Sequence, residues 1–472
     1  MPLIEPVPLL PPESLGAVHF IAVGGAGMSG IAAMYASLGV PTSGSDQADS
    51  ATLAALAEAG VRTFVGHDPA QLGDAATVVV SSAVRESNPE LSEARRRGLR
   101  VWHRSAALGA LMLGRRGVAV TGTHGKTTTS AMVATLLTAT GADPGYVIGS
   151  PLTSTGRSYR LGTGEAFVVE ADESDGSYLQ YPAEIVVITN VEADHLDNWG
   201  TAQAYAEGFV RIATAPGVRA VVLRSDDPGT AGVADVIRAA GKQVVTFGAD
   251  ERSDVRLEDL HTASSGAFAT LVADGDAGPL QLAVPGEYNL FNAAAAYAAC
   301  RLLGVPGEDL RAAAATFAGT SRRFELVAEI GGARVYDDYA HHPTEVAATL
   351  TAARQLAGGG RVVACFQPHL FTRTRDFAAE FGRALALADE ILVLGVYPAR
   401  EDPIPGVTGR LVADAAAGAA GAERVTYAET LAEGVDALAG LLRPGDLAVT
   451  IGAGDVTRIG RELASRAPGG GR

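Results

Sequence analysis

A chain of 472 residues is long enough for about three domains of ordinary size. Hydrophobic residues make up 47% of it and charged residues 19%, as in folded globular proteins, and no apolar run approaches the ~18 residues of a membrane span. The net charge of -16 argues against long-range attraction to nucleic acid or to an anionic membrane. We therefore expect no nucleic acid partner and no membrane insertion, and local groups must hold any anionic substrate.

Both cysteines, Cys300 and Cys365, lie in apolar runs typical of helix and strand interiors. No Cys or His spacing around them suits a metal site or a redox pair, so we expect buried thiols. This usage, together with an N-terminus that has no basic segment before an apolar one, favours a cytoplasmic protein.

The first motif follows the apolar run that begins at Val18. Residues 25–30 read GAGMSG, a literal G-x-G-x-x-G, and Asp46 comes 21 residues after Gly25. The pattern predicts a strand, a tight glycine turn and a helix N-terminus that binds a diphosphate, with the acid near a ribose. On this motif alone, a nicotinamide or flavin oxidoreductase is an open alternative.

Short β-rich runs alternate with alanine-rich helical stretches along the chain. This rhythm predicts parallel sheets covered on both faces, in three α/β domains. We place these domains at residues 1–108, 109–319 and 320–472. Within the second, residues 257–286 alternate like antiparallel strands and predict an accessory sheet.

The strongest local signal is the stretch Gly122–Thr128, which reads GTHGKTT between a strand and an apolar helix. Backbone N–H groups and a helix N-terminus would there face phosphate oxygens. Lys126 would neutralise the β- and γ-phosphate charge, and Thr127 would ligate Mg²⁺. The spacing is a compact variant, because the usual P-loop would have glycine where Val120 stands.

Two acidic stretches follow expected strands of the same domain, at residues 170–175 (EADESD) and 192–197 (EADHLD). Strand ends in a parallel sheet surround the ligand crevice, where carboxylate and imidazole groups can hold Mg²⁺ ions that bridge ATP and substrate oxygens. Each stretch taken alone is open to a second interpretation as a solvated acidic loop. Beside a P-loop, a metal carboxylate is the interpretation we favour.

Polar residues in the rest of the chain leave more alternatives open. Asn289 and Asn292 share a helix face and would read an adenine edge or cap the helix. Arg322 and Arg323, at the expected domain boundary, would reach a transferring phosphoryl group or form surface ion pairs. Further candidates follow strands of the last third, namely Asp337, Asp338, His341, His342, His369, Arg373 and Arg375.

Taken together, the stretches HFIAVGGAGMSGIA, GTHGKTTT, EADESDGS, TNVEADHLD, NLFNAAAA, RRFE, DDYAHHPTE and QPHLFTRTRDF resemble the Mur ligases. The resemblance runs in order from about Val18 to Asp455. GTHGKT is shared with a wider ligase superfamily that includes folylpolyglutamate synthases. GGAGMSG and DDYAHHPTE occur in a smaller group of proteins, and they resemble the motifs of the branch that joins L-alanine to UDP-N-acetylmuramate.

The resemblance implies an α/β fold of three domains: a Rossmann-like N-terminal domain, a P-loop ATPase-like central domain with a mostly parallel sheet, and a Rossmann-like C-terminal domain. It implies a ligase of peptidoglycan precursor synthesis, with ATP, UDP-N-acetylmuramate and L-alanine as substrates, Mg²⁺ as cofactor, and a monomer or homodimer as assembly. The lactyl carboxylate would attack the γ-phosphate of ATP, and the alanine amine would then attack the acyl phosphate.

Site residues carry over from the resemblance position by position. The implied ATP-binding residues are Gly122, Thr123, His124, Gly125, Lys126, Thr127, Thr128, Asn289, Asn292, Arg323 and Asp338. The implied UDP-sugar residues are Gly25, Ala26, Gly27, Met28, Ser29, Asp46, Ser81 and Ser82. His341 and Arg373 would bind the amino acid. The implied magnesium ligands are Thr127, Glu170 and His195, and the implied catalytic residues are Lys126, Glu170, His195 and Arg323.

Three places depart from the family pattern. Leu370 stands where many relatives have arginine, Tyr288 stands where histidine is common, and residues 148–158 (IGSPLTSTGRS) differ from the usual loop. No lysine lies between Thr127 and Gly241, so the carbamoylated lysine of some related ligases has no candidate, as the resemblance implies for this branch. The alternatives are a related ligase that adds a larger peptide to the same UDP-sugar, a Rossmann oxidoreductase and a P-loop regulatory NTPase.

Overall fold

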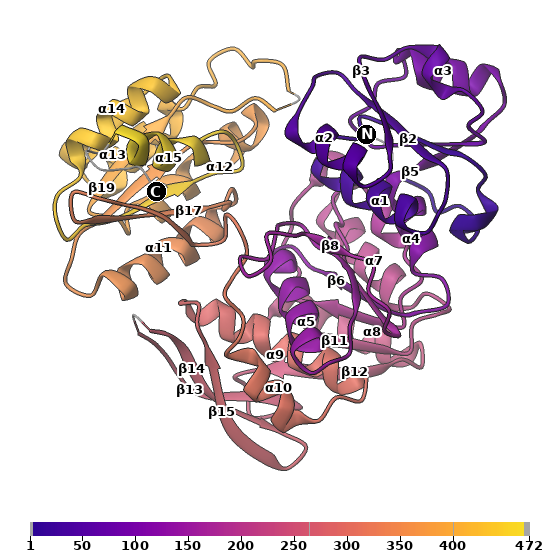
Figure 1. The fold of residues 1–472 in the computed structure, drawn as a ribbon. Coiled ribbons are helices and arrows are strands. Elements are labelled where there is room, and N and C mark those ends of the chain that lie inside the picture. Colours follow the sequence, from indigo (N-terminus) through magenta and orange to yellow (C-terminus); the bar gives the residue numbers. More distant parts are fainter. Residues whose placement is uncertain (1–2, 264, 400, 467–472) are drawn as a thin grey trace. The chain divides into compact units, whose positions relative to one another are not determined.

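The computed structural model describes residues 3–263, 265–399 and 401–466, and its strands form three sheets (Figure 1). The first sheet has the strand order β3-β2-β1-β4-β5, with every neighbour parallel. Its strands are β1 (Val18–Ile21), β2 (Thr42–Asp46), β3 (Arg62–Val65), β4 (Thr77–Val80) and β5 (Arg100–His103). Its helices are α1 (Ala26–Ser37), α2 (Ala51–Glu58), α3 (Pro89–Arg96) and α4 (Arg104–Leu111). The order reverses between β1 and β4, the place where open α/β sheets bind ligands.

The second sheet has the order β15-β14-β13-β12-β11-β10-β6-β9-β7-β8. Its strands are β6 (Arg116–Thr121), β7 (Gly145–Val147), β8 (Tyr159–Arg160), β9 (Ala166–Glu170), β10 (Ile185–Ile188), β11 (Ala220–Arg224), β12 (Gln243–Gly248), β13 (Val255–Ala263), β14 (Gly266–Ala273) and β15 (Asp276–Leu282). The strands from β12 to β7 pair in parallel, and β8 is antiparallel to β7. The accessory sheet expected in residues 257–286 is not separate, because β13 pairs with the end of β12 and extends the same sheet.

Six helices follow these strands: α5 (Lys126–Ala139), α6 (Leu196–Trp199), α7 (Ala202–Ala213), α8 (Pro228–Ala239), α9 (Glu287–Leu302) and α10 (Gly307–Ala314). The local sequence explains where two of these helices begin. Thr201 and Asp227 cap α7 and α8 with side-chain oxygens, and α8 has proline in its first turn. A short 3-10 helix, η3 (Ser177–Gln180), follows β9.

The third sheet has the order β16-β17-β21-β18-β19-β20 and is parallel except for β16. Its strands are β16 (Glu325–Ile330), β17 (Ala333–Asp338), β18 (Val362–Phe366), β19 (Glu390–Leu394), β20 (Val425–Ala428) and β21 (Leu447–Ile451). Its helices are α11 (Pro343–Ala357), α12 (Phe371–Leu385), α13 (Arg410–Ala420), α14 (Leu431–Leu441) and α15 (Thr457–Arg466). Two separate apolar clusters pack against this sheet, which agrees with helices on both faces. The α/β class with three parallel-rich sheets, expected from the sequence, is confirmed.

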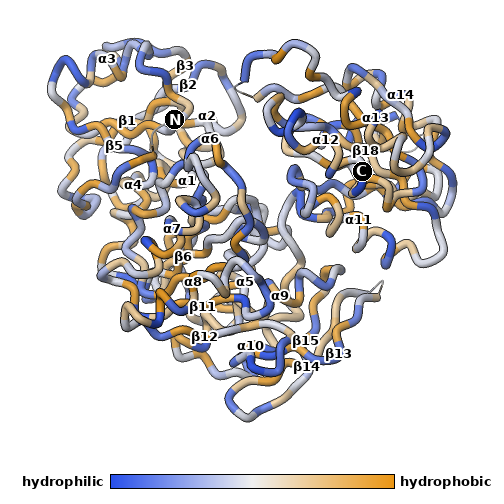
Figure 2. The backbone as a smooth tube through the Cα atoms, turned by 180° about the vertical axis from the view of Figure 1, so that it is seen from behind, coloured by the Kyte–Doolittle hydropathy of each residue, from blue (hydrophilic) through white to orange (hydrophobic). Residues whose placement is uncertain are grey.

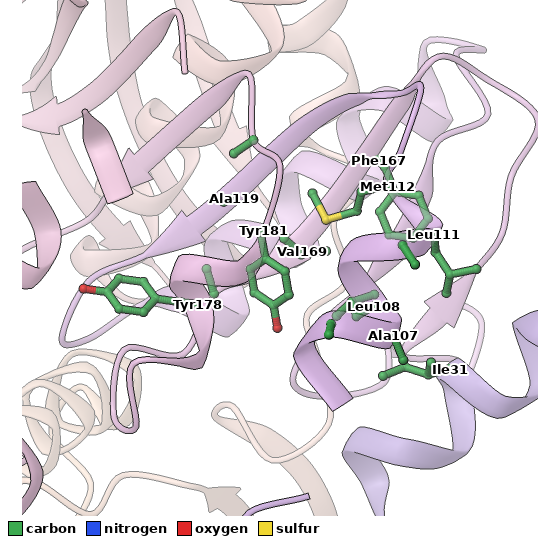
Figure 3. Packing of buried hydrophobic residues seen from close by; sticks show 14 of the residues in the cluster. Ile31, Ala107, Leu108, Leu111, Met112, Ala119, Phe167, Val169, Tyr178 and Tyr181 are labelled. Atoms are coloured by element: carbon green, nitrogen blue, oxygen red, sulfur yellow. The ribbon is translucent and has the colours of Figure 1, made fainter. Parts of the chain in front are cut away.

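The described chain divides into two compact units: residues 1–258, 270–280 and 291–317, and residues 259–269, 281–290 and 318–472. The first unit contains the first sheet and most of the second. One apolar cluster joins them, with Ile31 of α1, Leu108 of α4 and Phe167 of β9 among its members (Figure 3). The predicted boundary after residue 108 falls inside α4. The three-domain boundaries therefore stay a prediction.

The strands that sequence reasoning missed are short strands with partly exposed residues. The clearest cases are β3 and β16, in which no residue is fully buried. Such strands lack the continuous apolar run that marks a covered parallel strand. The apolar runs themselves fall on the central strands, as the orange segments of Figure 2 show. None of the helices in the described part of the chain has the length and hydrophobicity needed to cross a bilayer.

Candidate active site

The first glycine motif forms a strand-turn-helix, as predicted. Gly25 is the residue before α1 and supplies no side-chain cap, so backbone N–H groups are presented at the helix N-terminus. The N–H of Gly24 donates to Asp46 Oδ2 at 2.9 Å, which ties the end of β2 to the loop. A Cβ at Gly30 would lie 2.7 Å from the ring of Tyr159, so this glycine allows close packing between α1 and β8.

The predicted serines lie just after β4, at its carboxyl end. The Ser82 hydroxyl donates to Asp175 Oδ2 at 2.8 Å and lies 3.1 Å from His103 Nε2. Ser82 thus connects the first sheet to the loop after β9. The nucleotide-binding roles of Ser81 and Ser82 stay predictions.

The second glycine motif leads directly into α5. Gly122 and Gly125 have φ angles of 127° and 83°, and a Cβ on Gly122 would overlap Thr189. Both positions require glycine, since side chains rarely adopt these angles. Asn190 holds the loop from the neighbouring strand end: its Oδ1 accepts from the N–H of His124 at 2.9 Å, and its Nδ2 donates to His124 O at 3.0 Å. Sequence reasoning did not single out Asn190.

The remaining residues of the two glycine motifs are held by burial or by hydrogen bonds. Met28 of the first motif and Thr128 of the second are buried. The hydroxyl of Thr123 donates to Glu192 O at 2.9 Å, and His124 Nε2 lies 2.9 Å from Glu192 Oε2. The loop after β10 therefore braces the P-loop through both backbone and side-chain contacts.

The ammonium of Lys126 is turned toward its own loop and a buried acid. Its Nζ donates to Gly122 O at 2.8 Å and Thr123 O at 3.0 Å, and it lies 2.9 Å from Glu173 Oε2. The Glu173 side chain has no exposed surface and also accepts from the Tyr205 hydroxyl at 3.0 Å. Glu173 was one of several acids in the EADESD stretch, and only burial separates it from the others.

Two opposing effects set the charges of this pair. Burial lowers the pKa of Lys126, but the neighbouring carboxylates Glu173 and Asp172 raise it above its ordinary value. Burial raises the pKa of Glu173, and Lys126 offsets only part of that rise. Burial also raises the pKa of Asp172, yet Lys126 holds it below its usual range. The site therefore keeps a charged lysine among buried acids.

Two of the three predicted magnesium ligands are in direct contact. The Thr127 hydroxyl donates to Glu170 Oε1 at 3.0 Å, and Glu170 Oε2 accepts from the Gly149 N–H at 2.7 Å. A hydroxyl and a carboxylate side by side match the oxygen ligands that Mg²⁺ prefers. His195 lies near the Lys126–Glu173 pair, with its Nε2 4.0 Å from Glu173 Oε1, and it adopts a left-handed φ of 53°.

The two predicted asparagines have different surroundings. The Thr129 hydroxyl donates to Asn292 Oδ1 at 3.1 Å, and a Cβ on Gly125 would lie 2.7 Å from the same oxygen. Asn292 therefore lies against the P-loop and the first turns of α5, in the interior of α9. Asn289 Nδ2 donates to Pro285 O at 2.6 Å. Capping of α9 by Asn292 is excluded by its place in the helix.

In the second unit, Asp338 organises the segment that carries Arg323. Asp338 accepts from the backbone N–H groups of Phe324 and Ala340, both at 2.8 Å. The Arg323 guanidinium lies over the Tyr339 ring, 5.2 Å from its centroid. Burial raises the pKa of Asp338 to about 6, although Arg323 and the two N–H donors act against that rise. The structure thus places Asp338 and Arg323 together.

The predicted amino-acid residues also lie near each other. The His341 N–H donates to Glu345 Oε2 at 2.9 Å, and the His341 and His369 rings are 5.9 Å apart at their centroids. Burial lowers the pKa of His341 to about 4, and the positive charge of Arg373 contributes to the lowering. His341 is therefore neutral at pH 7. Arg373 is buried in the first turn of α12.

Two of the departures noted in the sequence lie beside these residues. Leu370 precedes α12 with a φ of 70°, a left-handed angle that is uncommon for a bulky residue. Tyr288 packs against the apolar cluster of the third sheet, and burial raises the pKa of its hydroxyl. Tyr288 is thus accommodated by the packing of this unit, whereas Leu370 holds an uncommon backbone angle.

Comparison with known proteins matches all three parts of the chain. The family model described as Mur ligase family, catalytic domain, matches residues 17–116. Mur ligase middle domain matches residues 120–300, and Mur ligase, glutamate ligase domain, matches residues 322–454. A relative from Cutibacterium acnes, named UDP-N-acetylmuramate--L-alanine ligase, is 62% identical over 98% of both chains.

The chain belongs to the Mur ligase family.

A second Mur ligase of the same printed name, from Kineococcus radiotolerans, is 56% identical over 95% of this chain and 96% of its own. Among solved structures, UDP-N-acetylmuramate-alanine ligase MurC from Thermotoga maritima is 29% identical with a TM-score of 0.79, covering 95% of this chain and 98% of that one. A murein peptide ligase from Psychrobacter arcticus, at 24% identity and a TM-score of 0.70, shares the fold. The Mur ligase resemblance inferred from the motifs is confirmed.

Proposed function

We propose that the protein is an ATP-dependent ligase that joins L-alanine to the lactyl carboxylate of UDP-N-acetylmuramate, with release of ADP and phosphate, in peptidoglycan precursor synthesis. The observation that carries this proposal is the presence of two glycine loops in one chain, at residues 25–30 and 122–128, each of which leads into the N-terminus of a helix. Relatives that are 62% and 56% identical are named UDP-N-acetylmuramate--L-alanine ligase, which supports the same substrates. A cofactor site for NAD is not needed, because the second loop suits ATP and leaves the first for the UDP of the sugar.

The residues of the P-loop suit the charge problem of this reaction. A carboxylate that approaches the γ-phosphate of ATP meets electrostatic repulsion, which Lys126 and Arg323 would offset where charge develops. The attack forms the bond between a carboxylate oxygen and phosphorus and breaks the bond to ADP. The alanine amine then adds to the acyl carbon, and phosphate leaves.

The residues present fit a magnesium ion. Thr127 and Glu170 would hold it with oxygen ligands, as their contact at 3.0 Å allows, and His195 is the third candidate. When bound, Mg²⁺ supplies positive charge that stabilises the phosphate oxygens.

We propose His341 and Arg373 as the alanine-binding residues. We also propose that residues 1–108, 109–319 and 320–472 are the three functional domains. Because both cysteines are free and buried, we further propose cytoplasmic action, as a monomer or homodimer.

An assay of ADP and phosphate release tests the proposal. Release is expected only when UDP-N-acetylmuramate and L-alanine are present together, with a product that mass spectrometry identifies as the alanyl UDP-sugar. Equal turnover with a tripeptide in place of alanine would favour the related peptide-adding ligase. Brisk hydrolysis with neither acceptor present would favour a regulatory NTPase, and stoichiometric NAD(H) binding would favour an oxidoreductase.

A further inference from the structure

Arg104, the first residue of α4, lies against the first glycine loop. A Cβ built on Gly27 would lie 2.9 Å from Arg104 Nη1 and 3.3 Å from the central guanidinium carbon. Gly27 is the second residue of α1. Glycine at this position therefore leaves room for the guanidinium beside the first turn of the helix, and a larger residue would displace it.

The Arg104 guanidinium has no acceptor among the residues that the structure describes: no hydrogen bond or ion pair of its side chain is present. Its residue is only partly exposed. Other partly buried arginines of the same unit are paired, as Arg116 is with Glu184 at 2.7 Å. A partly buried charge without a partner is costly, so a missing anionic ligand is the simplest reason for this arrangement.

Two backbone donors lie in the first turn of the same helix, α1. The N–H groups of Ala26 and Gly27 donate to no carbonyl within the described chain, whereas those of Met28 and Ser29 already donate to Gly25 O. Free N–H groups at a helix N-terminus attract anions. The chain carries a net charge of -16, so a diphosphate needs a local cation here.

The positive charge of Arg104 reaches the neighbouring groups of the same unit. Burial lowers the pKa of His103 to about 4, and Arg104 adds to that lowering while Asp175 opposes it. The charge of Arg104 thus influences His103, while the guanidinium forms no ion pair among the described residues and its N–H donors stay available.

We propose that Arg104 binds the diphosphate of UDP-N-acetylmuramate, jointly with the N–H groups of Ala26 and Gly27. The proposal rests on the function proposed above, because it names a further binding residue of the same UDP-sugar site. A guanidinium and two convergent amides would supply charge and direction together, as phosphate sites commonly do. Arg104 is a binding residue, with no part in proton transfer.

Titration calorimetry with UDP and with UDP-N-acetylmuramate tests this assignment on the full chain. Arg104→Ala is expected to weaken both ligands by the same factor, about tenfold to hundredfold, the usual range for a hydrogen bond to a charged group. Arg104→Lys keeps the positive charge but loses the planar set of N–H donors, so its affinity should lie between those of Arg104→Ala and the wild type. The matched control is Arg62→Ala, which removes one exposed positive charge from the first sheet away from the loop.

Steady-state kinetics supply the second readout. Arg104→Ala should raise KM for UDP-N-acetylmuramate and leave KM for ATP and kcat near the wild-type values. Unchanged UDP affinity in a folded Arg104→Ala variant overturns the assignment. So does a loss confined to UDP-N-acetylmuramate, which would place Arg104 at the sugar or lactyl group. If the wild-type chain itself binds neither ligand, the proposed function fails, which is a distinct outcome.

Discussion

The ammonium nitrogen of Lys126 lies 2.9 Å from a carboxylate oxygen of Glu173, and the two side chains are 14% and 0% exposed. Lys126 is followed by Thr127, which contacts Glu170, and His195 Nε2 lies 4.0 Å from Glu173 Oε1. The geometry of the Lys126–Glu173 pair keeps the lysine charged before nucleotide binds. Glu173 is therefore expected to position Lys126 as well as to stabilise the fold.

Glu173→Gln should lower the free energy of unfolding by about 3–5 kcal/mol, because it removes the carboxylate that is paired with the buried charge of Lys126. Lys126→Met should cost less, since Glu173 has a raised pKa and can take up a proton when the lysine is gone. Urea unfolding of both variants and of the double variant measures these differences. Equal losses in the two single variants would contradict this asymmetry.

Lys126→Ala should abolish ligation and leave UDP-sugar binding close to that of the wild type, because the first glycine loop is built on a different sheet. The loss of activity follows from the loss of the cation that offsets γ-phosphate charge. ADP release and calorimetry with UDP-N-acetylmuramate measure the two quantities. A folded variant that no longer binds the UDP-sugar would contradict the division of labour between the loops.

Glu170→Gln should raise the Mg²⁺ concentration needed for half-maximal activity by roughly tenfold or more, because an amide is a poorer ligand for this ion than a carboxylate. Activity measured against Mg²⁺ concentration, after removal of metal with a chelator, tests this. Glu165→Gln is the control, since Glu165 is exposed just before β9 while Glu170 is the last residue of that strand. The same shift in both variants would argue against a metal role for Glu170.

Gly125→Ala should greatly weaken ATP binding. Its φ is 83°, which strains any side chain, and a Cβ would lie 2.7 Å from Asn292 Oδ1, so the loop or the Asn292 side chain must shift. Gly141→Ala is the matched control: Gly141 has the same φ of 83° but no neighbour within 4 Å of a Cβ. That control should lose about 1–2 kcal/mol of stability from the left-handed backbone and keep its affinity for ATP. Calorimetry with a non-hydrolysable ATP analogue distinguishes the two.

His341 should make stability depend on pH between about 6.5 and 4. Burial lowers its pKa from 6.5 to about 4, so the unfolded chain binds the proton more readily in that window. The contribution is complete above 6.5 and is lost as the pH falls toward 4. The free energy of unfolding of the wild type minus that of His341→Gln should therefore fall by about 3 kcal/mol between pH 6.5 and pH 4. The titration of Asp338 is common to the wild type and to His341→Gln, so it cancels in this comparison. A difference in free energy of unfolding that stays constant with pH would contradict the expectation.

The sequence by itself determined the features that are local in the chain. The two glycine loops, their helices and the central strands were predictable because each depends on a few consecutive residues: glycine at left-handed φ angles, and apolar runs in covered strands. Family membership followed from the order of these motifs. The short, half-exposed strands such as β3 and β16 were missed because their side chains lack that apolar signature.

Only the tertiary structure decided which of several similar side chains share a site. Glu170 and Glu173 stand three residues apart in one acidic stretch, yet one contacts Thr127 and the other is buried against Lys126. Glu170 is the last residue of β9, whereas Glu173 follows the strand and has a fully buried side chain. Neither difference can be read from the residue type. Arg104 and Gly27 are far apart in the sequence, and only the packing of α4 against α1 brings the guanidinium to the loop. Such contacts depend on how the helices pack, which local sequence does not specify.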